Sequence, residues 1–505
     1  MPREAPTGPQ RELAVDLYRV VAVALIVAGH WLAASVTYRH GGFVRENPLE
    51  ELPWTQWLTW IFQVVPVFFL VAGYAGAASW TRRTTPVFDD WLRRRFRGVL
   101  GPTTAYVAVV LAVVGAALLA GVDRSSIDLS GWAVAMHLWF IPMYLAVVAL
   151  TPLAVAMHRR WGLLAPAALC VAVAVVDAVS VSGLLPALGI ANNLLCWLAL
   201  FQLGVAWFFG SVRGRGAVGL AVTAGLLVSV VLAVGPYPVS LIGVPGQVVQ
   251  NSAPPSVVLL LVGLVQSGLL IAIAPTVTRW LRGSFVEGPL AAANRRVMLV
   301  YLWHMLAVVV LAVVAYPAGL FPTPPMGTGA WWLSRLLWIA VLSALTALVL
   351  AVVGFGRTVL AADLVSVPVR MPESMAVPLL LVGAGIAGTV LWEFSSLGFA
   401  PGGRFPVGMA LVFAAGIAVA ALRPSAPPEG TVGADSGSLV RSPRVASRPR
   451  LSSCPRRRRR SSTMNCAVWS RRCAVAFPDI LVARSSASWP TSTGSWPPTP
   501  RSPRI

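Results

Sequence analysis

Apolar runs long enough to cross a membrane recur along most of the chain and are separated by short polar segments. A helix needs about 20 mostly apolar residues to span the hydrocarbon core of a bilayer. This pattern predicts an all-α fold, a polytopic transmembrane helical bundle of about ten to twelve spans. The expected spans are 13–36, 54–80, 98–122, 132–157, 162–182, 191–211, 216–236, 256–276, 296–319, 330–354, 376–393 and 405–422.

Composition agrees with a membrane protein and excludes an ordinary soluble domain. Hydrophobic residues make up 57% of the 505 residues and charged residues only 11%, whereas soluble domains carry roughly 25% charged residues. The first apolar segment contains charged residues and has no small-residue cleavage site after a short apolar core. We therefore expect it to stay in the protein as a helix and not to be removed as a signal peptide.

The chain is expected to divide into four segments. A polar N-terminal segment, 1–12, precedes a membrane domain of ten spans, 13–354, and two additional candidate spans follow in 355–423. The remaining residues, 424–505, form a basic tail rich in Ser, Pro and Arg, whose composition predicts disorder. Two interpretations of the tail stay open: a cytoplasmic segment that lies on anionic lipid, and a shifted reading frame.

The arginine distribution predicts the orientation in the membrane. The chain has no lysine, and the connections after even-numbered expected spans hold sixteen arginines against four after odd-numbered spans. Because cytoplasmic loops carry the excess of basic residues, we expect both termini in the cytoplasm of a plasma-membrane protein. Membrane-flanking arginines and the tail account for the net charge of +21, so no nucleic-acid partner is expected.

Three ionisable residues interrupt the first apolar segment. Asp16, Arg19 and His30 lie in a stretch made mostly of Leu, Val, Ala and Ile. Ionisable groups are costly inside a membrane and mark functional sites. Arg19 and His30 are eleven residues apart, which is about 16 Å along a helix. We expect the guanidinium near one membrane surface and the imidazole well inside.

Four further patterns lie in or beside later spans. The second span ends in Pro-Val-Phe-Phe-Leu-Val-Ala-Gly-Tyr at 66–74, and Arg-Arg-Arg-Phe-Arg at 93–97 precedes the third. The fourth contains His-Leu-Trp-Phe-Ile-Pro at 137–142, and the ninth contains Tyr-Leu-Trp-His at 301–304. With the first-span residues, these patterns resemble the membrane-bound acyltransferase-3 family of integral-membrane O-acyltransferases, over about residues 13–350.

The resemblance implies transfer of an acyl group, which we expect to be acetyl, from a cytoplasmic acyl-CoA to a hydroxyl at the outer face. The acceptor would be a glycan, a glycolipid or a secreted secondary metabolite. The family's first-helix Arg and His fall on Arg19 and His30, and its Arg-x-x-Arg before the third helix falls on Arg94 and Arg97. The chain departs from the family's pattern at Ala72, where a serine usually precedes the glycine.

These residue types suit that chemistry. Guanidinium groups bind phosphates well, so Arg94 and Arg97 are candidate donor-binding residues near the cytoplasmic face. His30 can take a proton from a hydroxyl and return it to a thiolate, or can carry the acyl group covalently. Asp16 and Arg19, three residues apart on one helical face, complete the candidate catalytic group. Topology anchoring by the arginines and simple packing of His30 stay open as alternatives.

Four residues are candidates for acceptor binding: His137, Trp139, Tyr301 and His304. We expect His137 at the outer end of its span, near the depth of His30, and His304 nearer the cytoplasmic side. Packing roles for both histidines, and an interfacial role for the Tyr-Leu-Trp-His run, remain open.

A transporter or flippase for lipid-linked sugars or small molecules is the alternative function. Transporters commonly show internal repeats, broken helices and acidic relays near the midplane. Here Asp177 is the obvious acid away from the first span, and no repeat is evident. The five cysteines lack the spacing of a metal or disulfide framework, and no metal is expected.

Overall fold

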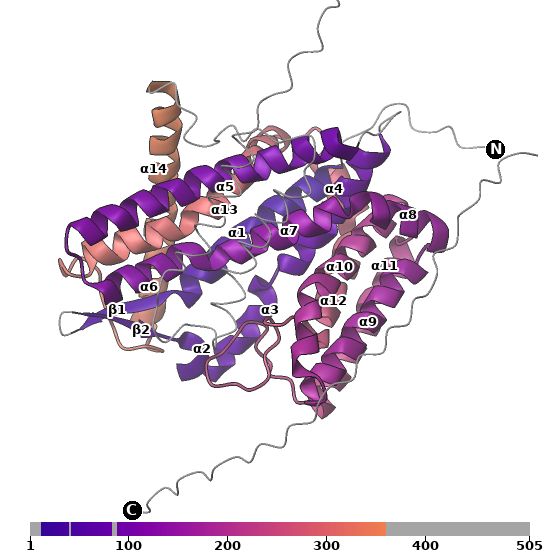
Figure 1. Ribbon diagram of the computed structural model, residues 1–505, viewed down its shortest axis with the longest axis horizontal. Coiled ribbons are helices and arrows are strands. Elements are labelled where there is room, and N and C mark those ends of the chain that lie inside the picture. The colour runs from indigo at the N-terminus through magenta and orange to yellow at the C-terminus, as the bar shows by residue number, and fades with distance from the viewer. Residues whose placement is uncertain (1–11, 40–41, 83–87, 360–505) are drawn as a thin grey trace, which may run out of the picture. The chain divides into compact units, whose positions relative to one another are not determined.

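The computed structural model describes residues 12–39, 42–82 and 88–359, whose regular secondary structure is helical apart from one hairpin (Figure 1). The longer helices are α1 (Leu13–Ala33), α4 (Val65–Thr81), α5 (Phe88–Leu119), α6 (Arg124–Ala135), α7 (Phe140–Ala149), α8 (Thr151–Trp161), α9 (Leu164–Val181), α10 (Asn192–Phe208), α11 (Gly214–Val234), α12 (Val257–Leu281), α13 (Glu287–Ala315) and α14 (Gly329–Val359). The shorter elements are α2 (Pro48–Glu51), α3 (Thr59–Phe62) and the 3-10 helices η1 (Pro53–Leu58), η2 (Met136–Trp139) and η3 (Pro186–Ala191).

Ten helical segments of the described chain are long and apolar enough to cross a membrane, so this is a multi-pass membrane protein. They are Leu13–Ala33, Pro53–Thr81, Gly98–Leu119, Leu129–Ala149, Leu164–Val181, Pro186–Phe208, Gly214–Val234, Val257–Leu281, Glu287–Ala315 and Gly329–Gly354. They confirm the predicted helical bundle and correspond to the first ten expected spans. The largest differences are the end of the fourth span and the start of the ninth.

The chain divides into two units, Met1–Glu429 and Gly430–Ile505. The second unit lies wholly outside the described residues, as do the expected spans 376–393 and 405–422. The predictions for these segments and for the basic tail therefore remain predictions.

Prolines divide two segments that the apolar pattern predicted as continuous spans. The expected span 132–157 is instead built from α6, η2, α7 and α8, with Pro142 in the first turn of α7 and Pro152 in the first turn of α8. The second span likewise breaks between α3 and α4, just before Pro66. Proline lacks a backbone N–H and its ring clashes with the carbonyl four residues earlier, so helices begin at proline more readily than they continue through it.

A short hairpin follows α1 and was not predicted. Strands β1 (Ser35–Arg39) and β2 (Gly42–Glu46) pair antiparallel, with Ser35 opposite Glu46 and Arg39 opposite Gly42. The hairpin and α2 connect the first two spans, at the end of the bundle where α1 finishes (Figure 1).

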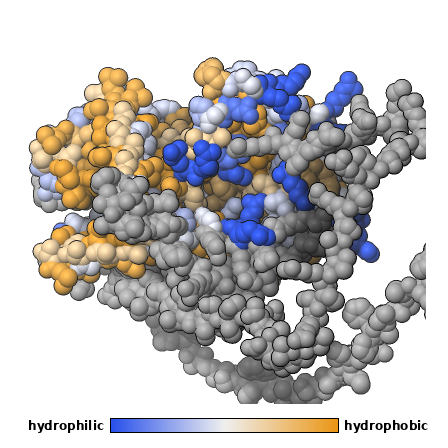
Figure 2. Space-filling view, turned by 90° about the horizontal axis from the view of Figure 1, so that it is seen from above, coloured by the Kyte–Doolittle hydropathy of each residue, from blue (hydrophilic) through white to orange (hydrophobic). Residues whose placement is uncertain are grey.

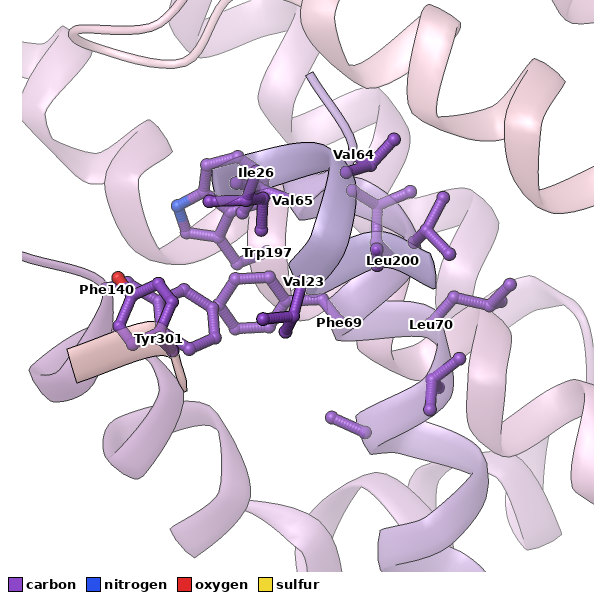
Figure 3. Packing of buried hydrophobic residues seen from close by; sticks show 14 of the residues in the cluster. Val23, Ile26, Val64, Val65, Phe69, Leu70, Phe140, Trp197, Leu200 and Tyr301 are labelled. Carbon is purple, nitrogen blue, oxygen red and sulfur yellow. The ribbon is translucent and has the colours of Figure 1, made fainter. Parts of the chain in front are cut away.

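Helix α1 is central to the packing of the described chain. It contacts α3, α4, α12, α13 and α14, and side chains from several of these helices meet in one large hydrophobic core. Figure 3 shows part of that core, where Val23 of α1 lies among Phe69 of α4, Phe140 of α7 and Tyr301 of α13. The core thus holds together the helices that carry the sequence motifs.

Helices α4 and α10 approach so closely that their backbones touch. A Cβ added at Gly73 would come within 2.0 Å of the Phe201 carbonyl oxygen, and one added at Gly204 would come within 2.0 Å of the Leu70 carbonyl oxygen. Small residues permit such close contact between membrane helices. Neither glycine can therefore accept a side chain without moving the helix opposite.

Large hydrophobic side chains also cover much of the outer surface, as expected for helices that face lipid. Leu119, Val234 and Leu226 are among the exposed ones. In Figure 2, hydrophobic residues dominate one end of the visible face and hydrophilic residues gather toward the other.

Candidate functional site

The polar residues near the start of α1 face α13. Asp16 Oδ1 accepts a hydrogen bond from Asn294 Nδ2 at 2.6 Å, and Arg19 Nη1 donates to Asn294 Oδ1 at 3.3 Å. The two partners determine the orientation of the Asn294 amide group, because a carboxylate only accepts hydrogen bonds and a guanidinium only donates them. Asn294 therefore joins the acid and the base that the sequence predicted on one face of α1.

The same two helices meet again at a pair of histidines. His30 Nδ1 lies 2.9 Å from His304 Nε2, and the two ring planes are inclined by only 12°. Residue numbers increase in the same direction along both helices, from the Asp16–Asn294 contact to the His30–His304 contact. Helices α1 and α13 therefore run parallel. The structure therefore brings together two candidate residues that are 274 positions apart in the sequence.

The prediction that His304 lies nearer the cytoplasmic side than His30 is wrong, because their rings are hydrogen-bonded. The cause is the start of the ninth span. The apolar pattern placed that start at 296, but α13 begins at Glu287. His304 is consequently as many residues from the start of α13 as His30 is from the start of α1.

The backbone carbonyl of Tyr301 fixes the proton positions in this pair. His304 Nδ1 lies 2.7 Å from that oxygen, and a carbonyl oxygen can only accept, so His304 Nδ1 carries the proton. In neutral His304 the Nε2 is then an acceptor, and His30 Nδ1 must donate to it. Neutral His30 thus keeps its free lone pair on Nε2, which has no hydrogen-bond partner among the described residues.

His137 forms the third member of this group, which we call the histidine cluster (His30, His137 and His304). It lies in η2, and its ring centre is 5.0 Å from that of His304 and 5.3 Å from that of Tyr301. The side chain is fully buried, and neither ring nitrogen has a hydrogen-bond partner within the described chain. Its backbone carbonyl accepts a hydrogen bond from the Tyr301 hydroxyl.

The break in the fourth span positions His137. A 3-10 turn replaces the α-helix at 136–139, and the His137 carbonyl oxygen accepts both from the Phe140 backbone N–H and from the Tyr301 hydroxyl. Irregular backbone at membrane depth is tolerated where it is buried in protein. The ring centre of Tyr106 lies 5.7 Å from that of His137, and the two rings are inclined by 66°. Tyr106 and Tyr301 thus both pack against the imidazole.

Two tryptophans brace the histidine cluster from the hairpin end. Trp31 Nε1 donates to the His304 carbonyl oxygen at 3.2 Å, and Trp338 Nε1 of α14 donates to the Trp31 carbonyl oxygen at 2.9 Å. Both indole rings are buried. These bonds hold α1, α13 and α14 in register beside the cluster.

Trp139, the remaining candidate for acceptor binding, packs elsewhere. Its ring is 6.0 Å from that of Trp197 on α10 and 6.3 Å from that of Phe140. Tyr301, by contrast, touches both His137 and Phe140. The structure thus gives Tyr301 a direct contact with the cluster and gives Trp139 a place in the adjoining aromatic packing.

The arginines before the third span divide by environment. Arg94 is exposed, and the side chain of Arg97 lies outside the described structure. Arg95 instead donates to Ser79 Oγ at 2.6 Å and to the Ala75 carbonyl oxygen at 2.9 Å, and so ties α5 to α4. The candidate donor-binding residue that is described, Arg94, is therefore free of the helix contact that occupies its neighbour.

Asp177, the acid considered for the transporter alternative, binds the connection between α11 and α12. Its Oδ2 accepts from the Tyr237 hydroxyl and from the Val257 backbone N–H, each at 2.8 Å. Burial raises the pKa of Tyr237, and the hydrogen bond to Asp177 raises it further. The carboxylate therefore anchors the connection between α11 and α12 to α9.

Sequence reasoning missed Asn294, Trp31, Tyr106 and Trp338. A polar residue at the start of an apolar run could have drawn attention to Asn294, but its two partners are far away in sequence. No group of three or more His, Cys, Asp or Glu side chains within the described residues is arranged to hold a metal ion.

Comparison with known proteins gives one match. A family model described as an acyltransferase domain, acyltransferase 3, matches residues 12–355. No curated protein matches the chain. No solved structure matches it either.

Proposed function

Because the chain belongs to the acyltransferase 3 family and is therefore a membrane-bound acyltransferase, we propose that it moves an acyl group, acetyl in the simplest case, from cytoplasmic acyl-CoA to a hydroxyl at the outer face. The acceptor is a glycan, a glycolipid or a secreted secondary metabolite. One observation carries the proposal: the hydrogen-bonded chain from the Tyr301 carbonyl through His304 leaves a free basic nitrogen, Nε2, on His30.

In the proposed reaction, His30 Nε2 accepts the proton of the acceptor hydroxyl as its oxygen attacks the thioester carbonyl carbon. The new C–O bond forms, the C–S bond breaks, and the imidazolium returns its proton to the departing thiolate of coenzyme A. His304 supports this role because it holds His30 through Nδ1 and keeps Nε2 directed away from the pair. A positioned acid or base of this kind contributes ~10²–10⁴-fold in rate.

A covalent variant uses the same nitrogen. His30 Nε2 would attack the thioester carbonyl itself, release the thiolate and hold the acyl group until the acceptor hydroxyl takes it. The hydroxyl proton then leaves with a second base, for which His137 is the candidate in the histidine cluster, because neither of its ring nitrogens has a hydrogen-bond partner within the described residues.

Donor binding is assigned to arginines at the proposed cytoplasmic end. Arg94 is exposed and can reach a soluble phosphate-bearing donor, and Arg97 lies one helical turn further along α5. Arg19 of α1, which donates a hydrogen bond to Asn294 of α13, contributes positive charge between that surface and the histidine cluster. The arginine excess in even-numbered connections supports this orientation.

The test is acyl transfer by a purified His30→Gln variant reconstituted in lipid, with labelled acetyl-CoA and cell-surface glycan extract as acceptor. Glutamine keeps the size and a hydrogen-bonding edge but cannot cycle a proton, so transfer should fall by ~10²-fold or more. His158→Gln is the matched control, because His158 bonds Ser211 outside the cluster and should leave turnover unchanged.

Near-normal turnover by His30→Gln would make His30 a packing residue and remove the centre of the proposal. An inactive variant that still binds donor would support it. Incubation of the wild-type protein with labelled donor alone then separates the two routes, because an acyl-histidine retains the label on the protein and direct transfer does not.

A further inference from the structure

Arg335 of α14 is a buried cation between two tryptophans. Its side chain is only 4% exposed. Its guanidinium carbon lies 5.1 Å from the ring centre of Trp331 and 5.3 Å from that of Trp338. Indole faces attract a guanidinium electrostatically, and the attraction is stronger when water is excluded. The two rings therefore cover the cation without occupying its N–H groups.

The hydrogen-bond donors of this guanidinium are not all satisfied. Within the described chain, Arg335 Nε and Nη1 are buried and have no hydrogen-bond partner. The Tyr316 hydroxyl and the Glu46 carboxylate lie near enough to interact with the guanidinium electrostatically. A buried cation with unmet donors is costly unless something pairs with it.

Arg335 is connected to the proposed reaction site through two tryptophans. Trp338, which packs on the guanidinium, donates to the Trp31 carbonyl oxygen, and Trp31 in turn donates to the His304 carbonyl oxygen. Two residues, Trp338 and Trp31, therefore separate the cation from the histidine cluster. It lies toward the hairpin end of the bundle, which the arginine distribution assigns to the outer face.

We propose that Arg335 is an acceptor-binding residue that recognises an oxyanion, a carboxylate or a phosphate, on the molecule that receives the acyl group. This inference rests on the proposed function and narrows its acceptor to an anionic glycan or glycolipid. Guanidinium N–H groups match oxyanion lone pairs and give charge-assisted hydrogen bonds. The flat faces of Trp331 and Trp338 restrict the guanidinium to one plane and so fix the direction of those bonds.

The experiment compares acceptors that differ in one charged group. Purified protein in a detergent that contains neither phosphate nor sugar receives labelled acetyl-CoA with methyl β-D-glucoside, methyl β-D-glucuronide or methyl β-D-glucoside 6-phosphate. We expect transfer to at least one anionic sugar to exceed transfer to the neutral one by about 10-fold or more, since a charge-assisted hydrogen bond contributes about one factor of ten or more.

Variants test whether Arg335 is the source of the preference for an anionic sugar. Arg335→Gln should abolish the advantage of the anionic sugar, and Arg335→Lys should recover only part of it because ammonium lacks the planar donors. Arg215→Gln, which removes an exposed arginine in the first turn of α11, should leave the advantage unchanged. The comparison of acceptors with the wild-type protein needs no variant, so it decides the question even if Arg335→Gln fails to fold.

Three readouts separate the outcomes. Release of free coenzyme A without acceptor reports donor turnover at His30; its absence from the wild-type protein, together with absent transfer, would overturn the proposed function and this inference with it. Donor turnover with equal transfer to neutral and anionic sugars would overturn this inference alone. Inhibition by added phosphatidylglycerol that disappears in Arg335→Gln would identify a lipid phosphate as the occupant and would overturn the acceptor assignment.

Discussion

His304 holds His30 through Nδ1, at 2.9 Å, and so leaves Nε2 as the basic nitrogen of the α1 histidine. The two residues divide one task. One imidazole is committed to hydrogen bonds at both nitrogens, and the other keeps a free lone pair. We therefore treat His304 as a positioning residue and His30 as the catalytic residue of the proposed reaction.

This division makes a prediction for His304. His304→Leu should lower the turnover number by roughly 10-fold or more, part of the ~10²–10⁴-fold contributed by a positioned acid or base, because His30 loses the acceptor that fixes its tautomer. His304→Gln should recover much of the loss, since its side-chain carbonyl can still accept from His30. Steady-state kinetics with acetyl-CoA measures both.

The KM for donor is the control for that pair, because neither change touches the arginines proposed to bind it. Equal losses in the Leu and Gln variants, or a loss confined to KM, would contradict a positioning role.

The bridge of Asn294 predicts a compensating pair of substitutions. Asn294→Asp replaces the donor to Asp16 by a second carboxylate and should lower the free energy of unfolding by about 1 to 3 kcal/mol. Adding Asp16→Asn places an amide donor at position 16 opposite the new carboxylate at position 294, and that carboxylate can still accept from Arg19. The double variant should therefore be more stable than the Asn294→Asp protein.

Thermal unfolding followed by tryptophan fluorescence in detergent gives the double-mutant cycle. Additive losses would show that the two side chains do not act on each other.

Substitutions of neighbouring arginines in α5 should have different effects. Arg94→Gln combined with Arg97→Gln should weaken use of donor, because each removes a charge-assisted bond that contributes about 1.5 to 3 kcal/mol. Arg95→Gln should instead lower the melting temperature, because Arg95 ties α5 to Ser79 and Ala75 of α4. Donor titration of reconstituted protein and thermal unfolding, run on both proteins, separate the effects.

Unchanged donor affinity in the double variant would reduce Arg94 and Arg97 to topology anchors.

Orientation can be measured with single cysteines in a cysteine-free background. Glu51→Cys, in the connection between the first two spans, should react with an impermeant thiol reagent added outside cells, because odd-numbered connections hold few arginines. Arg215→Cys, at the start of the seventh span, should react only after permeabilisation. Both positions are exposed, so the opposite labelling pattern would reverse the proposed direction of transfer.

The sequence predicted the spans well because an apolar run of sufficient length is a property of consecutive residues. It predicted the breaks poorly, although Pro66 and Pro142 were visible inside the runs, because a proline can either kink or end a helix and the choice depends on packing. The hairpin also had a local signal, the Gly41-Gly42 pair between β-branched and aromatic residues.

The candidate site was predicted in part. Asp16, Arg19 and His30 stood out because ionisable groups are rare in apolar runs. Their hydrogen-bond partners, Asn294 and His304, lie more than 270 residues away in the sequence and reach them only when α13 packs parallel to α1. Residue type alone could not reveal that pairing or the tautomer that follows from it.

The parallel course of α1 and α13 also has an electrostatic consequence. Two parallel helices present both of their C-terminal ends, each equivalent to about half a negative elementary charge, at the same face. Those ends are near Trp31 and Tyr316, which are the surroundings of Arg335. The helix pair thus supplies a diffuse counter-charge for the guanidinium that keeps it ionised within the bundle without taking up its hydrogen-bond donors.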